Sequence, residues 1–231
     1  MRFLETPNLP LGRVTHMMVG EKYINLLADP LKKRGINIIP VKGSAELPTP
    51  VSNHADMLVH HLGRDIFVSS KSNMSSIKKC IPQINLLRCE KEPIGKYPDD
   101  VSLNVLRVGK FAFGAKEHVS PDILRYFAGN DVIFINVRQG YAKCSAAVVD
   151  EASVITADPG LCSALEKHNI RVLLISPGYI SLKGYNYGFI GGACGKISRN
   201  EIAFTGVLDE HPDRKKIFEF LEERKVFPVF L

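Results

Sequence analysis

The feature that most constrains the fold is a unit of two short strands, a helix and a third strand that recurs along the chain. Each unit ends in a short apolar run rich in β-branched residues, which is typical of a buried strand. These runs begin at Ile36, Ile84, Val132, Arg171 and Val226. A helical stretch precedes each run, and two of these stretches begin at the cap and turn signals Ser120-Pro121 and Asp158-Pro159. The recurrence predicts five similar building blocks within one fold.

Four of the helical stretches are also preceded by two alternating segments joined at a tight turn, which is the signal of a β-hairpin. The turns are expected at Gly63-Arg64, Gly109-Lys110, Asp150-Glu151 and Arg199-Asn200. The first unit is shorter and has a single strand before its helix. The sequence therefore predicts an α/β protein built of five ββαβ units. Their approximate ranges are 1–44, 45–95, 96–138, 139–180 and 181–231.

The residues that lead into the four hairpins are evenly placed. Asp56, Asp100, Cys144 and Cys194 are 44, 44 and 50 residues apart. A ring of units with pseudo-fivefold symmetry brings such positions together around one axis, so we expect them to line one central pocket. On this basis residues 1–231 form a single domain, because the connections between units are too short to be flexible linkers. An ordinary α+β domain whose strands happen to be evenly spaced is the alternative.

Composition limits the remaining classes of function. The first residues contain Glu5 and two prolines where a signal peptide has an apolar run, so a soluble cytoplasmic protein is expected. The five cysteines are odd in number and show no zinc-site spacing, which argues against a disulfide scaffold and implies no metal or other cofactor. The net charge of +6 is scattered, and its densest clusters, 32–34 and 214–216, lie on expected helices. Neither nucleic acid nor a membrane is therefore an expected partner.

The strongest chemical candidate is Cys194, within the glycine-rich run 191–195. The reactive form of cysteine is the thiolate, and nearby positive charge or N–H donors are needed to lower its pKa. Backbone N–H groups of the glycine run, together with Lys143 or Lys196, are expected to do this. Two alternatives stay open: Cys194 is a small buried apolar residue, or Cys144 is the reactive thiol.

The repeat and these residues resemble the pentein, or α/β-propeller, superfamily of guanidine-modifying enzymes, which includes deiminases, dimethylarginine dimethylaminohydrolase and amidinotransferases. The resemblance implies a five-unit ring with a funnel-shaped central site. It places the nucleophilic cysteine at Cys194 and the guanidinium-binding carboxylate at Asp56. It also implies an acidic position at Asp100 in the third unit. Tyr141 stands where the family has its proton-shuttling histidine, and this departure puts ordinary hydrolysis in question.

A small cationic guanidine or amidine is the expected ligand of the pocket. Carboxylates bind such planar cations in a bidentate manner, so Asp56 and Asp100 are the predicted contacts. Asn53 and Lys143 are further candidate contacts near the same hairpins. The aromatic residues expected to cover the pocket are Tyr179, Tyr185, Tyr187 and Phe189.

The expected reaction is cysteine-dependent hydrolysis or amidino transfer, with Cys194, Tyr141 and His54 as the catalytic residues. His54 lies two residues from Asp56 in an extended segment, so both side chains face the same side and His54 can replace the missing imidazole. A surface histidine without a catalytic role is the alternative for this position. For the whole protein, the alternative is a non-catalytic pentein that binds the ribosome or another macromolecule.

Overall fold

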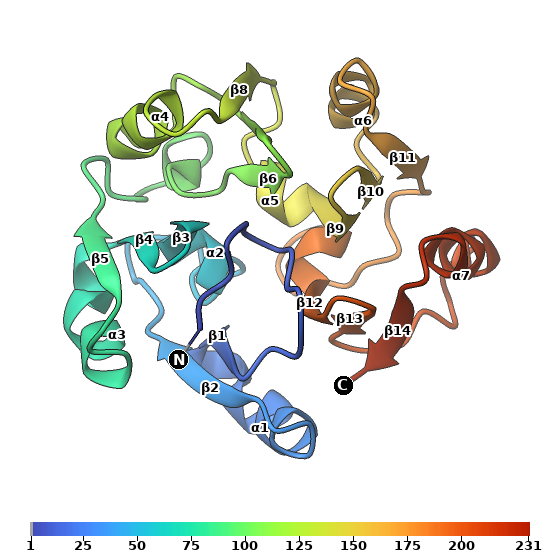
Figure 1. The fold of residues 1–231 in the computed structure, drawn as a ribbon, viewed down its shortest axis with the longest axis horizontal. Coiled ribbons are helices and arrows are strands. Elements are labelled where there is room, and N and C mark those ends of the chain that lie inside the picture. Colours follow the sequence, from blue (N-terminus) through green and yellow to red (C-terminus); the bar gives the residue numbers. More distant parts are fainter. Residues whose placement is uncertain (1) are drawn as a thin grey trace.

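Five separate sheets follow one another around a central axis in the computed structural model, which describes residues 2–231 (Figure 1). The first sheet has two parallel strands, β1 (His16–Gly20) and β2 (Asn37–Val41). Each of the other four has three strands. They are β3 (Val59–Gly63), β4 (Ile66–Ser69) and β5 (Asn85–Arg88); β6 (Leu106–Val108), β7 (Phe111–Gly114) and β8 (Ile133–Asn136); β9 (Ala146–Asp150), β10 (Ser153–Thr156) and β11 (Arg171–Leu174); β12 (Cys194–Ser198), β13 (Glu201–Phe204) and β14 (Phe227–Phe230).

Within each three-stranded sheet, a hairpin is followed by a helix and a parallel strand. The helices lie on the outside of the ring (Figure 1). They are α1 (Ile24–Lys32), α3 (Met74–Cys80), α4 (Pro121–Ala128), α6 (Pro159–Glu166) and α7 (Arg214–Glu223). The start of α6 shows why the sequence signals were informative: Pro159 occupies its first turn, and Asp158 Oδ1 accepts a hydrogen bond from the Leu161 N–H. The predicted α/β architecture of five units with pseudo-fivefold symmetry is confirmed. Across residues 2–231, every helix is too short or too polar to cross a lipid bilayer.

The apolar core is divided into five clusters, and four of them lie between two neighbouring units. The cluster between the first and second units also includes Val101 of the third and Cys144 of the fourth. The cluster that closes the ring packs Val19 and Leu31 of the first unit against Ile197 and Ala203 of the fifth. Next to it, the Val14 N–H donates to the Ile197 carbonyl at 2.8 Å. Each fully buried aliphatic side chain contributes about 1.5–3 kcal/mol, so the ring is held mainly by contacts between units.

The N-terminal segment, residues 2–13, crosses one face of the ring at the hairpin turns (Figure 1). The Arg64 N–H donates to the Leu4 carbonyl at 2.7 Å, and the Asn8 side chain donates to the Arg107 carbonyl at 3.3 Å. Leu9 packs against the cluster between the third and fourth units. This segment therefore covers the turn end of the hairpins, and the residues that lead into the hairpins lie at the opposite end.

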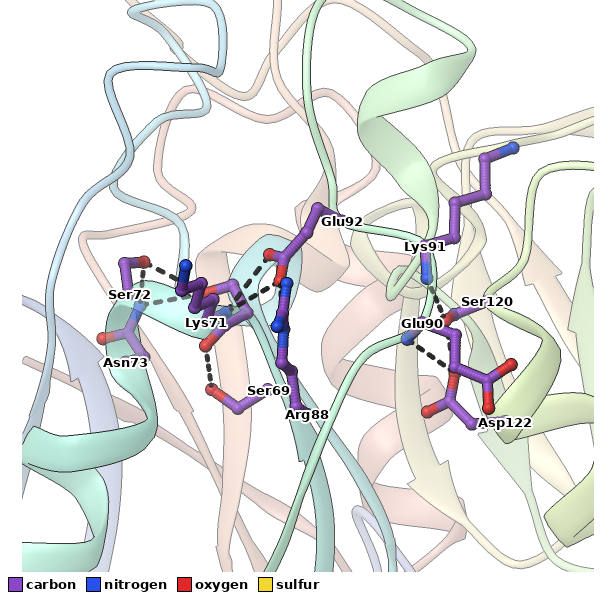
Figure 2. A network of polar contacts seen from close by, with 11 residues as sticks. Ser69, Lys71, Ser72, Asn73, Arg88, Glu90, Lys91, Glu92, Ser120 and Asp122 are labelled. Atoms are coloured by element: carbon purple, nitrogen blue, oxygen red, sulfur yellow. Dashed lines mark hydrogen bonds and ion pairs between the residues drawn. The ribbon is translucent and has the colours of Figure 1, made fainter.

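The connection between the second and third units is fastened to both of them (Figure 2). The Glu92 carboxylate accepts the Lys71 N–H through both oxygens at 3.1 Å. One residue earlier, the Lys91 N–H donates to Ser120 Oγ at 3.0 Å, at the start of α4. Hydrogen bonds therefore hold this connection against both units, and it is not a flexible linker.

Candidate active site

Short helical turns lead into the first strand of units two to five. They are α2 (Ala55–Leu58), the turn Asp99–Val101, α5 (Ala142–Ser145) and the turn Ile190–Ala193. The four evenly spaced residues do not occupy equivalent places in them, because Asp56 and Cys144 lie inside α2 and α5, whereas Cys194 is the first residue of β12. Even spacing identified the right end of the ring but not an exact structural correspondence.

A cavity of about 670 Å³ lies at this end of the ring. Its lining comes from the first, second, fourth and fifth units, so it is displaced from the central axis and away from the third unit. Six of the seven residues predicted from the sequence line it: Asn53, His54, Asp56, Tyr141, Lys143 and Cys194. Cys144 lines it too.

Asp100 is the exception, and its predicted contact with a substrate is wrong. Its side chain is completely buried in the third unit, and Oδ2 accepts a hydrogen bond from the Tyr141 hydroxyl at 2.5 Å. Burial raises the pKa of Asp100, and the hydrogen bond from Tyr141 opposes that rise. Asp100 therefore fixes Tyr141 from behind the cavity wall.

Tyr141 is poorly suited to the proton-shuttling role that its sequence position suggested. Burial is the larger cause that raises the pKa of the phenol, and the contact with Asp100 is the next. The hydroxyl already donates its hydrogen bond to that carboxylate. The ring lies 6.1 Å from the Phe189 ring, centroid to centroid. Tyr141 thus acts as a wall of the cavity and holds its proton.

Asp56 and Cys144 are hydrogen-bonded to each other, and Asn104, which sequence reasoning missed, holds Cys144 in place. The Cys144 thiol donates to Asp56 Oδ2 at 3.1 Å, and Asn104 Nδ2 donates to the Cys144 sulfur at 3.0 Å. Asn104 Oδ1 also accepts the Cys144 N–H at 3.1 Å, so this buried amide holds α5 by two bonds. A single asparagine before β6 carries no motif, and only the three-dimensional arrangement shows its role.

Lys143 supplies the positive charge nearest to this carboxylate. Its Nζ lies 4.0 Å from Asp56 Oδ2 and 3.4 Å from the Gly191 carbonyl oxygen. Lys196, the other lysine expected near the thiol, instead donates to the Arg199 carbonyl at the β12–β13 turn. Only one of the two lysines therefore faces the cavity.

Cys194 is partly exposed to the cavity but is not an activated thiol in the free protein. Burial raises its pKa to about 12; Lys143 opposes this rise and Asp56 adds to it. The expectation that the glycine run and the lysines would lower this pKa is wrong, because desolvation outweighs the single nearby cation. Cys144 is more deeply buried, and burial raises the pKa of its thiol well above the usual range. The free protein therefore carries two protonated thiols at neutral pH.

His54 lies beside Cys144 and lines the same cavity as Cys194. Its Nδ1 would be 3.9 Å from a Cβ placed on Gly192, and the Cys144 Cβ is equally near that point. Donor atoms of His54, Asp56 and Cys144 lie within 4.8 Å of one another, and these residue types are ligands of zinc. The sequence showed no metal-ligand spacing because the fold, rather than a local motif, brings these three together.

Two glycines near the start of β12, Gly191 in the preceding turn and Gly195 in the strand, differ in their surroundings. A Cβ on Gly191 would lie 2.3 Å from the Ala146 carbonyl oxygen and 2.5 Å from that of Lys143, which is closer than atoms can approach. Around Gly195 no atom lies within 4 Å of such a Cβ. Gly191 therefore allows the fifth unit to pack closely on α5 and β9.

Solved structures with the same arrangement of elements are enzymes that modify guanidines. An inosamine-phosphate amidinotransferase from Streptomyces griseus has a TM-score of 0.62 at 11% identity, covering 100% of this chain and 91% of that one. An amidinotransferase of saxitoxin biosynthesis from Microseira wollei has a TM-score of 0.59 at 10% identity, covering 97% and 90%. A dimethylarginine dimethylaminohydrolase variant with an S-methyl-L-thiocitrulline adduct has a TM-score of 0.55 at 10% identity, covering 90% and 80%. At such low identity the likeness shows the fold, which is the pentein fold.

Sequence comparison gives a family for the chain. No curated protein has a significantly similar sequence. A family model described as a family of unknown function, DUF6873, matches residues 18–231, which include every residue of the cavity named above. The chain therefore belongs to the DUF6873 family.

Proposed function

We propose that this protein is a cysteine-dependent enzyme that breaks a C–N bond of a small guanidine or amidine, by hydrolysis or by transfer of the amidino group. The observation that carries the proposal is one cavity lined by a carboxylate, Asp56, a partly exposed thiol, Cys194, and an imidazole, His54. The fold is shared with amidinotransferases and with dimethylarginine dimethylaminohydrolase. A guanidinium bound by Asp56 brings its central carbon towards the thiols.

The reaction is written with Cys194 as the nucleophile. Its thiol loses a proton to His54, and the thiolate attacks the guanidinium carbon to form a C–S bond. One C–N bond then breaks, the electron pair leaves with nitrogen, and His54 returns the proton to the departing amine. Water attacks the resulting thiouronium in hydrolysis, and an acceptor amine attacks it in transfer, so that Cys194 is regenerated as a thiol in both cases.

Because the pKa of Cys194 is raised in the free protein, the bound substrate has to help form its thiolate. A cationic guanidinium beside a thiol favours the thiolate, because opposite charges attract strongly where water is excluded. Lys143 already pairs with Asp56, so the substrate cation must displace its ammonium from that carboxylate. A displaced ammonium near Cys194 favours the thiolate further.

A non-catalytic binding module is the second candidate, and a specific observation favours it. Burial keeps the thiols of Cys194 and Cys144 protonated, and the Tyr141 hydroxyl is committed to Asp100. A protein that kept the ring but lost the chemistry would show these features. The same cavity would then bind a ligand without forming a covalent bond.

An alkylation experiment separates the two candidates. Chloroacetamidine and chloroacetamide both lose chloride to a thiolate, but only the amidine carries a positive charge. We expect the ratio of amidine to amide rates at Cys194 to exceed the ratio at the exposed Cys80 by at least about tenfold, measured by peptide mass spectrometry. Cys80 is an internal control, because it lies on α3 outside the cavity.

The Asp56→Asn variant completes the test. It keeps the shape of the side chain and removes its charge, so the preference of Cys194 for the amidine should decline to the ratio at Cys80. Equal ratios at the two cysteines of the wild-type protein would contradict the enzyme proposal and support the binding module.

A further inference from the structure

Apolar side chains form most of the cavity wall, far beyond what a guanidinium head needs. They come from β1, α1 and the segment before β12. The principal ones are Met17, Met18, Leu26, Ile180, Leu182 and Phe189. A cavity of about 670 Å³ has room for a ligand with many atoms beyond the head group.

Several of these side chains remain exposed although they border the cavity. Leu26 on α1 is 66% exposed, and Tyr185 and Tyr187 are 45% and 42% exposed. Large apolar side chains that gather around a hollow and stay in water are typical of a ligand-binding surface. A ligand that covers them removes this apolar area from water.

The tyrosines belong to a segment that folds back on itself at the edge of the cavity. The Gly188 N–H donates to the Ile180 carbonyl at 2.6 Å, and the Tyr185 N–H donates to the Leu182 carbonyl at 3.1 Å. Gly184, with φ near +100°, forms the bend between these bonds. The segment thus presents Tyr185 and Tyr187 on one side of the cavity, with α1 contributing Leu26 to the same lining.

The charges in the lining are few. Among the lining residues within 2–231, Asp56 is the sole side-chain carboxylate and Lys143 the sole lysine, and no arginine is present. Lys143 is already placed against Asp56 and the Gly191 carbonyl. A carboxylate or phosphate on the ligand would lose its water without gaining an arginine or an unpaired lysine, which is unfavourable.

We infer that the ligand of this cavity is a monocation with an apolar tail and no acidic group, its head at Asp56 and its tail along Leu26, Phe189 and Tyr187. This inference rests on the proposed function for the guanidine or amidine nature of the head. It separates the ligand from amino-acid substrates, whose α-carboxylate would find no arginine and only the paired Lys143 among the basic side chains Lys and Arg of this lining. An alkyl- or arylalkyl-substituted guanidine or amidine has the required chemistry.

Calorimetric titration of a Cys194→Ser variant tests the ligand class without any covalent step. The probes are alkylguanidinium ions from methyl to hexyl. Each buried methylene stabilises the complex, so affinity should rise roughly two- to fourfold per added methylene. An ω-guanidino carboxylic acid of the hexyl length should bind at least about tenfold more weakly, as should the neutral hexylurea.

Two variants assign the two ends of the ligand. Asp56→Asn should remove the preference for hexylguanidinium over hexylurea while retaining the rise with chain length. Leu26→Ser should weaken hexylguanidinium several-fold and leave methylguanidinium unchanged. Leu11→Ser is the matched control, because Leu11 is 69% exposed and lies in the N-terminal segment outside the cavity, so it should change neither affinity.

The possible outcomes distinguish this inference from the proposed function. Affinity that does not rise with chain length, or an acid that binds as tightly as the alkylguanidinium, overturns the ligand class. The predicted affinity series in Cys194→Ser, without amidine-selective alkylation of wild-type Cys194, supports the ligand class and overturns the enzyme proposal. Amidine-selective alkylation of wild-type Cys194, without a rise in affinity with chain length, supports the enzyme proposal and overturns the ligand class.

Discussion

The Cys144 thiol donates a hydrogen bond to Asp56 Oδ2 at 3.1 Å, and this bond joins α5 to α2 across 88 positions of the sequence. The same sulfur accepts a hydrogen bond from Asn104 Nδ2 at 3.0 Å. One buried thiol therefore orients the carboxylate that we assign to the ligand head, and Asn104 holds that thiol in place. This makes Cys144 a positioning residue rather than a second nucleophile.

Replacement of Cys144 should show this role. Cys144→Ala removes the sulfur that accepts from Asn104 Nδ2 and donates to Asp56, so the free energy of unfolding should decrease by about 1–3 kcal/mol more than in Cys162→Ala. Cys162 is a suitable control because it is also a buried cysteine, but it lies on α6 outside the cavity. Cys144→Ser keeps a donor and an acceptor and should recover part of the loss. Urea unfolding gives these values, and equal losses for the two alanine variants would contradict the role.

The reactivity of Cys194 should depend steeply on pH. Its pKa of about 12 means that the thiolate fraction, and with it the rate of iodoacetamide alkylation, rises about tenfold per pH unit between pH 7 and 10. The rate increases with pH because burial favours the neutral thiol and moves its ionisation to higher pH. The rates can be measured by mass spectrometry of the peptide that contains Cys194. A plateau near pH 8 would show an activated thiolate instead.

The packing of the fifth unit predicts a contrast between Gly191, in the turn before β12, and Gly195, the second residue of β12. Gly191→Ala places a methyl group 2.3 Å from a carbonyl oxygen, so the backbone must shift, and a loss of several kcal/mol of stability is expected, roughly 2–4. Gly195→Ala meets no atom within 4 Å and should change stability by less than about 0.5 kcal/mol. Thermal unfolding of both variants measures the contrast. Similar melting temperatures would contradict the close packing of Gly191 against Ala146 and Lys143.

Removing the Tyr141 hydroxyl should destabilise the protein in a pH-dependent way. In Tyr141→Phe the buried Asp100 loses the hydrogen bond that stabilises its ionised form, so its pKa should rise further. A carboxyl with a raised folded-state pKa contributes stability at low pH that is lost as pH rises. The loss relative to wild type should therefore be larger at pH 8 than at pH 5.

Denaturant titrations at the two pH values measure the Tyr141→Phe effect. Tyr187→Phe is the control, because Tyr187 is 42% exposed and its hydroxyl has no hydrogen bond among residues 2–231. A loss that is the same at both pH values would show that Asp100 remains protonated in the wild-type protein as well.

The fold was largely predictable because its signals are local. The strands beginning near Ile84 and Val132, and the turn at Arg199-Asn200, depend on β-branched runs and turn residues within a few positions. Their even spacing also indicated which residues would converge. The same spacing placed Asp100 in the cavity, yet side-chain direction within a short turn depends on tertiary packing, and Tyr141 covers this carboxylate.

The details of the site depend on distant partners and leave little trace in the sequence. Asn104 acts through Cys144, which is 40 positions away, and the crossing of the ring by residues 2–13 depends on Arg64 and Arg107. The pKa of Cys194 differs from the expectation because adjacent glycines and lysines are visible in the sequence, whereas desolvation by the surrounding units is not.

Ring closure has a consequence for how the protein forms during translation. Val14 bonds to Ile197, and the cluster that packs Leu31 against Ala203 joins the earliest unit to the last one synthesised. A nascent chain must keep the apolar flank of its first unit unpaired until some 180 further residues have left the ribosome. Contacts of such long sequence separation slow folding and favour association between incomplete chains, so chaperone binding and sensitivity to premature termination should concentrate on this flank.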